Sequence, residues 1–248
     1  MHQDLKLKVA GQELFGVIEN PGQKAVVILA HGYTGNMNGP QDIYVKLSRR
    51  LQEEGYSVIR FNFRGTSPSE GNQEDMTLAG EVKDLKTIIG HAKKERYKRI
   101  ILVGESFAGA VLAKAYTEKV DMMVFWYPLF ELRDCLFRDF INVRSEEKLK
   151  KEGFVEIEEF RVGPKLYKEI VDVDVYDLLK KVYVPTLLLH GDSDKDVPYQ
   201  QSEKAFELLP GIKELGLLQG ADHSFRHEQD EVIAKTVKFI QDELPTEG

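Results

Sequence analysis

Residues 104–109 read Gly-Glu-Ser-Phe-Ala-Gly and place Ser106 at the centre of a run of small residues. The run follows the apolar stretch 99–103 and precedes a segment of strong helix formers. A serine at the apex of a strand, a sharp turn and a helix is typical of the G-x-S-x-G nucleophile elbow. Here Ala108 replaces the last glycine, and the string alone also fits a helix cap at a strand end.

A serine hydroxyl becomes a useful nucleophile only when a base takes its proton and an acid orients that base. In elbow-type sites the acid and then the histidine follow the serine along the chain. His223 follows the apolar run 214–218, and the run 186–189 is followed by Asp192, Asp194 and Asp196. A single histidine after a strand is usually an ordinary loop residue, but the three elements in this order favour a catalytic triad. Spacing does not choose among the three aspartates.

The elements that must position these residues recur along the chain. Short apolar runs, typical of strands buried in a parallel sheet, occupy residues 25–30, 56–63, 99–103, 122–127, 186–189 and 214–218. Segments of helical period lie between or after them, at residues 43–54, 78–94, 107–118, 200–209 and 232–244. Residues 4–9 and 13–19 predict an antiparallel hairpin. The pattern predicts an α/β fold with a mainly parallel, eight-stranded sheet and helices on both faces.

One interval breaks this rhythm. About fifty residues separate the run ending near Pro128 from the run starting near Val184, and a loop this long without structure is uncommon in a compact domain. The interval contains a charged helical stretch at 145–152, an alternating run at 154–162 and a further segment at 174–181. We therefore expect residues 1–248 to form a single domain, with a small cap inserted at about 130–180.

Composition limits the partners and the compartment. The 248 residues carry a net charge of −7, which disfavours binding to nucleic acid or to an anionic membrane. The lone Cys135 cannot form an intramolecular disulfide, and no Cys/His cluster has the spacing of a zinc site. No apolar run approaches the length of a signal peptide core or a membrane span. We expect a cytoplasmic protein without cofactor or metal, and a homodimer is left open.

Taken together, these motifs resemble those of the α/β-hydrolase superfamily. Within it the chain is similar to the bacterial cinnamoyl or feruloyl esterases and to related small carboxylesterases and monoglyceride lipases. The resemblance covers nearly the whole chain and rests on residues 29–36, 61–65, 104–109, 189–198 and 220–223. It implies the α/β-hydrolase fold and cleavage of carboxylic esters by Ser106.

The resemblance also implies roles for individual residues. The pattern H-G-x-x-D-x-x-V-P matches residues 190–198 and implies that Asp194 is the orienting acid, with Asp196 ranked second. The family's H-G-[FY] loop implies that the backbone N–H of Tyr33 is one oxyanion-hole donor, and the N–H of Phe107 is the other. His31 and His190 match positions that order their loops. The chain departs from the family pattern at two positions. Ser67 replaces a glycine, and Glu105 stands where many relatives have histidine.

These features predict a serine esterase that takes short-chain acyl or aryl esters, including cinnamoyl esters. The candidates for the pocket lining are the aromatic residues of the insert, although for any single one packing of the cap onto the domain is the favoured interpretation: Phe137, Phe140, Phe154, Phe160 and Tyr167. The alternatives on the same triad are an acyl-peptide hydrolase, a thioesterase or a monoacylglycerol lipase. A non-catalytic ligand-binding homologue is the alternative from another class.

Overall fold

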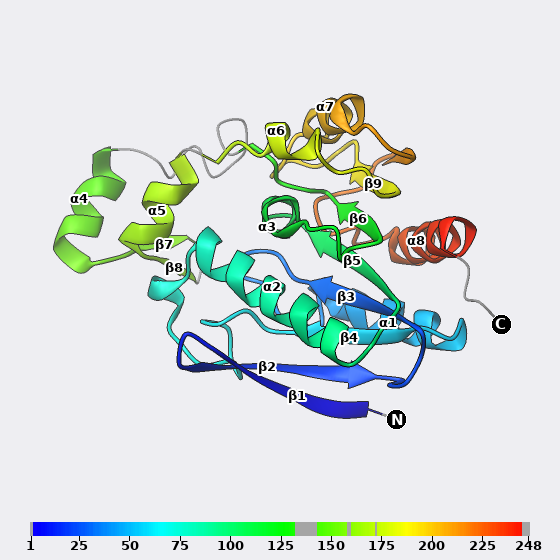
Figure 1. Ribbon diagram of the computed structural model, residues 1–248. Coiled ribbons are helices and arrows are strands. Elements are labelled where there is room, and N and C mark those ends of the chain that lie inside the picture. The colour runs from blue at the N-terminus through cyan, green and yellow to red at the C-terminus, as the bar shows by residue number, and fades with distance from the viewer. Residues whose placement is uncertain (1, 132–142, 158–159, 172, 245–248) are drawn as a thin grey trace.

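A computed structural model describes residues 2–131, 143–157, 160–171 and 173–244. Its centre is an eight-stranded sheet in the order β1-β2-β4-β3-β5-β6-β9-β10 (Figure 1). The strands are β1 (His2–Val9), β2 (Gln12–Glu19), β3 (Ala25–Ala30), β4 (Ser57–Phe61), β5 (Arg99–Glu105), β6 (Met122–Trp126), β9 (Thr186–Gly191) and β10 (Lys213–Leu218). β1 and β2 pair antiparallel, β2 joins β4 antiparallel, and the remaining pairs are parallel. The predicted α/β-hydrolase sheet is confirmed.

Helices cover both faces of this sheet because its central strands are apolar on both sides. In β3, Val26 and Ile28 belong to one hydrophobic cluster, whereas Val27 and Leu29 belong to the other. The first cluster lies under α2 (Leu78–Lys94), α3 (Ala108–Ala115), α6 (Tyr176–Leu179) and α7 (Gln200–Leu208). The second lies under α1 (Ile43–Glu53) and α8 (Gln229–Glu243) (Figure 1). Two short 3₁₀ helices, η1 (Pro40–Asp42) and η2 (Gln73–Asp75), precede α1 and α2.

The interval between β6 and β9 has secondary structure of its own. It contains α4 (Val143–Glu152), the antiparallel pair β7 (Val155–Ile157) and β8 (Phe160–Val162), and α5 (Pro164–Val171), followed by α6. The alternating run thus forms a hairpin. The sequence did not predict α5, whose first residue, Pro164, suits the first turn of a helix because that position needs no N–H donor. Phe137 and Phe140 lie outside the described residues.

This insert contacts the rest of the chain at the start of α2. The carboxylate of Glu169, in α5, accepts hydrogen bonds from the backbone N–H groups of Leu78 (2.6 Å) and Ala79 (3.4 Å). A negative charge at a helix N-terminus is favourable because the first N–H groups have no partner within the helix. Gly163 packs so tightly on η2 that a Cβ atom there would lie 1.9 Å from the carbonyl oxygen of Glu74. The insert is therefore seated on η2 and α2.

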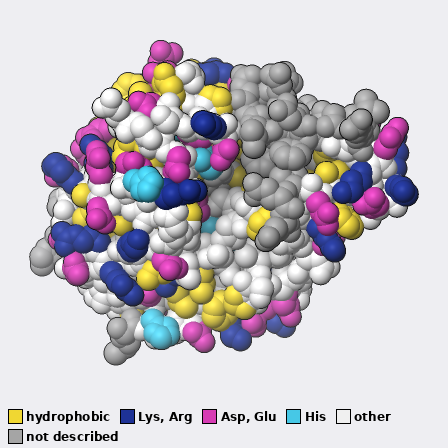
Figure 2. Space-filling model, turned by 180° about the vertical axis from the view of Figure 1, so that it is seen from behind, with side chains coloured by type: hydrophobic (Ala, Val, Ile, Leu, Met, Phe, Trp, Pro, Cys, Tyr) yellow, Lys and Arg dark blue, Asp and Glu magenta, His cyan; other side chains and the backbone are white. Residues whose placement is uncertain are grey.

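None of the helices in the described segments is long and apolar enough to cross a membrane. On the face shown in Figure 2, Lys and Arg side chains are interspersed with Asp and Glu rather than gathered in one patch. This distribution is typical of a solvated surface.

Candidate active site

Ser106 lies at the sharp turn between β5 and α3. Its φ is +51°, in the left-handed region that non-glycine residues rarely adopt, and such strain is characteristic of functional turns. The turn is held in place because the Ser106 N–H donates to the carbonyl of Trp126 (3.0 Å), and the Ser106 carbonyl accepts from Gly109 (2.8 Å) and Leu129 (2.8 Å). The elbow predicted from the sequence is present.

The small residues around Ser106 are required by close packing. A Cβ atom on Gly104 would lie 2.8 Å from the side chain of Leu112 in α3. A Cβ atom on Gly109 would lie 2.6 Å from that of Pro128. Ala108, which replaces the last glycine of the common pattern, is fully buried and fits as it stands. The close contact with Pro128 is made by Gly109, one residue after the position of the motif's last glycine. Ala108 at the motif position therefore leaves the turn intact.

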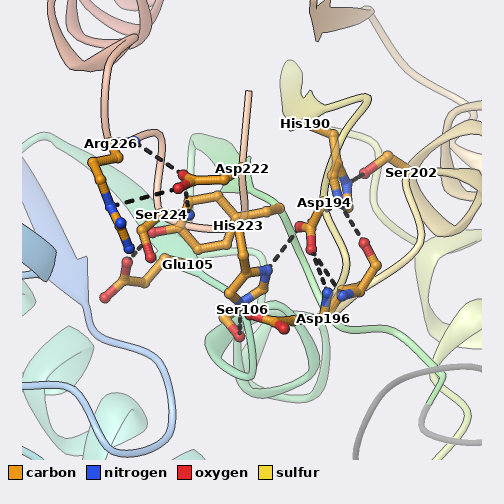
Figure 3. Close-up of polar contacts among 12 residues, drawn as sticks. Glu105, Ser106, His190, Asp194, Asp196, Ser202, Asp222, His223, Ser224 and Arg226 are labelled. Carbon is orange, nitrogen blue, oxygen red and sulfur yellow. Dashed lines mark hydrogen bonds and ion pairs between the residues drawn. The ribbon is translucent and has the colours of Figure 1, made fainter. Parts of the chain in front are cut away.

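Three side chains form a continuous hydrogen-bonded chain across this site (Figure 3). Ser106 Oγ lies 2.9 Å from His223 Nε2, and His223 Nδ1 lies 2.7 Å from Asp194 Oδ2. A carboxylate only accepts, so Nδ1 carries the proton and Nε2 is left to accept from the serine hydroxyl. The strands β5, β9 and β10 deliver these residues at their carboxyl ends, where open α/β sheets place their sites.

Asp194 is the aspartate that reaches His223. Its side chain has no exposed surface, and its Oδ1 accepts from the backbone N–H groups of Asp196 and Val197 (2.9 Å each). Burial would raise the pKa of Asp194, but the hydrogen bonds from His190 and His223 and the charge of His223 outweigh it and hold the pKa well below its ordinary value. Asp194 is therefore ionised at neutral pH.

The two neighbouring aspartates, Asp192 and Asp196, do not hydrogen-bond His223. The Oδ1 atom of Asp192 accepts from the N–H of Gly220 (2.7 Å), which links the loops after β9 and β10. Asp196 contributes its charge near His223 without a hydrogen bond to the ring. Ligand atoms of Asp194, Asp196 and His223 lie within 4.8 Å of one another, a spacing that a metal ion could use. In the triad geometry, however, His223 Nδ1 carries a proton that it donates to Asp194, so this nitrogen has no lone pair for a metal.

Both structural histidines lie where the resemblance implies. His31 is fully buried; it accepts from the N–H of Phe63 (3.1 Å) and its other ring nitrogen contacts the carbonyl of Gly32 (2.8 Å). Burial lowers the pKa of His31 to about 4, so it is neutral. His190 is also fully buried, with Nε2 3.1 Å from Asp194 Oδ2 and Nδ1 2.7 Å from Ser202 Oγ. The two rings order the loops after β3 and β9.

The two predicted oxyanion-hole residues lie side by side. The rings of Tyr33 and Phe107 meet edge to face with centroids 5.9 Å apart. Gly32 brings the loop close to the elbow, because a Cβ atom on it would lie 3.1 Å from the Cβ of Ser106. Within the described segments, the backbone N–H groups of Tyr33 and Phe107 donate no hydrogen bond, so both are free to bind an anionic oxygen.

The described aromatic residues of the insert have separate surroundings. The Phe160 ring lies 6.4 Å from that of Tyr33, whose hydroxyl donates to the carbonyl of Arg161 (3.4 Å). Phe154 stacks under the guanidinium of Arg161, with 4.5 Å between the guanidinium carbon and the ring centroid. Tyr167 is buried in the main hydrophobic cluster. Phe160 thus borders Tyr33 in the loop after β3, whereas Tyr167 packs the insert onto the domain.

Two contacts at the site were not predicted from the sequence. The carboxyl group of Glu105 accepts a hydrogen bond from the hydroxyl of Tyr127, and the Tyr127 ring packs on that of His223 with centroids 4.6 Å apart. Glu105 was noted in the sequence as a departure from the family pattern. No motif marks Tyr127, which reaches the site because β6 lies between β5 and β9.

Comparison with known proteins identifies the family to which this chain belongs. The chain is 24% identical over 203 residues to YfhR of Escherichia coli (strain K12), with 80% of this chain aligned, and it spans only 63% of the length of YfhR. It is 28% identical over 240 residues to the human mitochondrial palmitoyl-protein thioesterase ABHD10, covering 91% of this chain and 76% of the relative.

The fold is shared with solved structures. Est1E from Butyrivibrio proteoclasticus, solved with bound ferulic acid, superimposes with a TM-score of 0.81 over 97% of this chain and 99% of its own, at 20% identity. The sequence profile of the serine aminopeptidase S33 family (Hydrolase_4) matches residues 21–151, which include Tyr33 and Ser106. Because that match spans more than half of the sequence, the chain belongs to the serine aminopeptidase S33 family of α/β hydrolases.

Proposed function

We propose that this serine hydrolase cleaves carboxylic esters, with Ser106 as nucleophile, His223 as general base and Asp194 as orienting acid. The observation that carries the proposal is the unbroken chain of hydrogen bonds from Ser106 Oγ through the His223 ring to Asp194. Its distances of 2.9 and 2.7 Å lie within the reach required for proton transfer. Residues 1–248 would then act as one domain, with the insert as its cap.

The reaction proceeds through an acyl-enzyme. His223 Nε2 takes the hydroxyl proton as Ser106 Oγ attacks the ester carbonyl, and the N–H groups of Tyr33 and Phe107 bind the resulting oxyanion. The protonated imidazole then donates to the leaving alcohol. Water, activated by the same nitrogen, hydrolyses the acyl-enzyme and releases the acid. Asp194 stays ionised throughout and stabilises the imidazolium.

Short-chain acyl and aryl esters are the proposed substrates. Phe160, next to Tyr33, provides an aromatic surface close to the oxyanion loop. A thioesterase is the second candidate, favoured by the relation to ABHD10, since thioesters pass through the same tetrahedral intermediate. A cytoplasmic location and a small-molecule ester as the partner remain predictions.

The test is a substrate series. p-Nitrophenyl esters from acetate to palmitate, methyl ferulate, a monoacylglycerol and a palmitoyl thioester are compared by kcat/KM, each with wild type and Ser106→Ala. The proposal expects the highest kcat/KM on a short-chain or aryl ester, with turnover lost in the variant. A preference for the thioester would establish the second candidate instead. Activity confined to long-chain acylglycerols, or none at all, would contradict the ester assignment.

The pH dependence of this reaction is set by His223. Burial lowers the pKa of the imidazole, but the hydrogen bond and charge of Asp194, with the charges of Asp196 and Glu105, outweigh it and raise the pKa above its ordinary value. Only the neutral ring accepts the serine proton. We therefore expect kcat/KM for p-nitrophenyl acetate to rise with pH along a one-proton limb whose midpoint lies above about 6.5. Asp194, whose pKa is held low, adds no limb between pH 5 and 9. A flat profile over that range would count against a histidine base.

A further inference from the structure

Glu105 is a buried carboxyl group beside the nucleophile that the reaction above does not use. It is 3% exposed and immediately precedes Ser106 at the end of β5. Its Oε1 accepts from the backbone N–H of Gly32 (3.3 Å), and its Oε2 accepts from the hydroxyl of Tyr127. Burial raises the pKa of Glu105 above its ordinary value, although these two hydrogen bonds and the charge of His223 reduce that rise. In Figure 3 the Glu105 side chain extends away from Ser106, on the side opposite to Asp194.

The two hydrogen-bond donors to Glu105, Gly32 and Tyr127, contact different parts of the proposed catalytic site. Gly32 directly precedes Tyr33, whose N–H is a proposed oxyanion donor, so the hydrogen bond from the Gly32 N–H to Glu105 holds the loop one residue away from that donor. Tyr127 supports the general base, because its ring lies 4.6 Å from that of His223 with 53° between their planes. Burial and the charge of Glu105 raise the pKa of Tyr127 far above its ordinary value, so its hydroxyl remains a donor.

We propose that Glu105 is a positioning residue that ties the oxyanion loop and the aromatic support of His223 to the nucleophile elbow. The inference rests on the proposed function. A carboxylate suits this position because it has two oxygens that only accept, and its two partners here are both donors. A glutamine offers a single acceptor oxygen, so it either leaves one of the two donors without an acceptor or forces the Tyr127 hydroxyl to accept instead of donate.

The charge of Glu105 gives the proposal a second, independent readout. The groups facing His223 are Asp194 and Asp196 from the loop after β9, Glu105 from β5 and Tyr127 from the segment after β6. The negative charge of Glu105 favours the imidazolium form. Removing that charge lowers the pKa of His223, and the acid limb of kcat/KM moves to lower pH. The midpoint thus reports the charge of Glu105, whereas the loss of rate reports its two hydrogen bonds, and a carboxyl group whose charge does not reach His223 leaves the midpoint in place.

The experiment compares wild type with Glu105→Gln, Tyr127→Phe and the double variant. Two rates are measured: hydrolysis of the best p-nitrophenyl ester from pH 5 to 9, and covalent labelling of Ser106 by a fluorophosphonate. Because misplacing a reacting group by about 1 Å can cost 10²-fold, we expect Glu105→Gln to lower kcat and the labelling rate by roughly 10- to 100-fold, with KM changed less. Tyr127→Phe lowers both rates by a smaller factor. The double variant falls short of the product of the single effects because both changes remove one shared hydrogen bond.

The matched control is Glu81→Gln in α2. Glu81 is also 3% exposed, and no hydrogen bond joins it to the elbow, to Gly32 or to Tyr127 in the described segments. Glu81 acts electrostatically on the Tyr33 side chain but not on His223, so Glu81→Gln should leave the pH midpoint unchanged and should change kcat and the labelling rate far less than Glu105→Gln does.

The outcomes separate this inference from the proposed function. Wild-type rates and an unchanged midpoint for Glu105→Gln would overturn the positioning role while the ester assignment stands. If Glu105→Gln does not fold, Tyr127→Phe decides, since it keeps the ring and removes the hydrogen bond alone. A wild-type protein that neither hydrolyses any ester nor reacts with the fluorophosphonate would instead refute the proposed function, and the role of Glu105 with it.

Discussion

Ser106→Ala is expected to lower kcat for the best ester by about 10⁴- to 10⁶-fold, the range seen when a triad nucleophile is removed. The reason is chemical, because alanine has no atom that can form the acyl-enzyme. Steady-state hydrolysis measures the loss, and mass spectrometry of the fluorophosphonate adduct locates the reactive serine. We expect one adduct on the wild type, at Ser106, and none on the variant.

The control for this substitution is Ser193→Ala. Ser193 is an exposed serine in the loop that carries Asp194, and its hydroxyl donates to Asp192 (3.2 Å). Its removal should change kcat by less than about twofold, because exposed surface substitutions rarely disturb the packed structure. Full activity in Ser106→Ala would show that another residue forms the covalent bond, and the triad assignment would fall.

Asp194→Asn is expected to lower kcat/KM by about 10³- to 10⁴-fold. An amide can donate a proton toward His223 Nδ1, which moves the ring proton to Nε2 and leaves no acceptor for the serine hydroxyl. It also removes the charge that raises the pKa of His223, so the residual activity should show its acid limb at lower pH. The measurement is the pH profile of kcat/KM for the variant beside that of wild type.

Asp192→Asn and Asp196→Asn are the matched controls, because the sequence spacing alone leaves all three aspartates open. Neither side chain hydrogen-bonds His223, so we expect each variant to keep kcat/KM within about tenfold of wild type, with a small downward shift of the midpoint for Asp196→Asn. A larger loss for Asp196→Asn than for Asp194→Asn would reverse the assignment. Thermal unfolding of Asp194→Asn is recorded in parallel, since its side chain accepts four hydrogen bonds.

Much of this arrangement could be predicted because it depends on local patterns. The apolar runs mark the strands, and the chain order of Ser106, the aspartate loop and His223 places all three at one edge of a parallel sheet. The choice of Asp194 came from the resemblance rather than from spacing. The structure adds a hydrogen bond between Asp194 and His223 that agrees with it.

Other contacts could not be predicted because they depend on which strands become neighbours. Glu105 and Tyr127 end up in contact because β5 and β6 pair, with Glu105 opposite Trp126, and nothing in either segment indicates a partner. The helix α5 was missed because it has only eight residues. A helical period is hard to recognise over so short a segment directly after a hairpin. The docking of Glu169 on the start of α2 joins residues about ninety positions apart, beyond the reach of any periodicity.

The seating of the insert on α2 has a consequence for how this protein can change over time. The insert leaves after β6 and returns before β9 without adding a strand to the eight-stranded sheet. Its contacts with the domain include the Glu169 carboxylate on the first turn of α2 and the close packing of Gly163 on η2. A different hairpin or helix that keeps these two contacts could replace residues 143–171 and leave β5, β9 and β10 undisturbed. A lineage can therefore exchange the insert while it retains the strands that carry Ser106, Asp194 and His223.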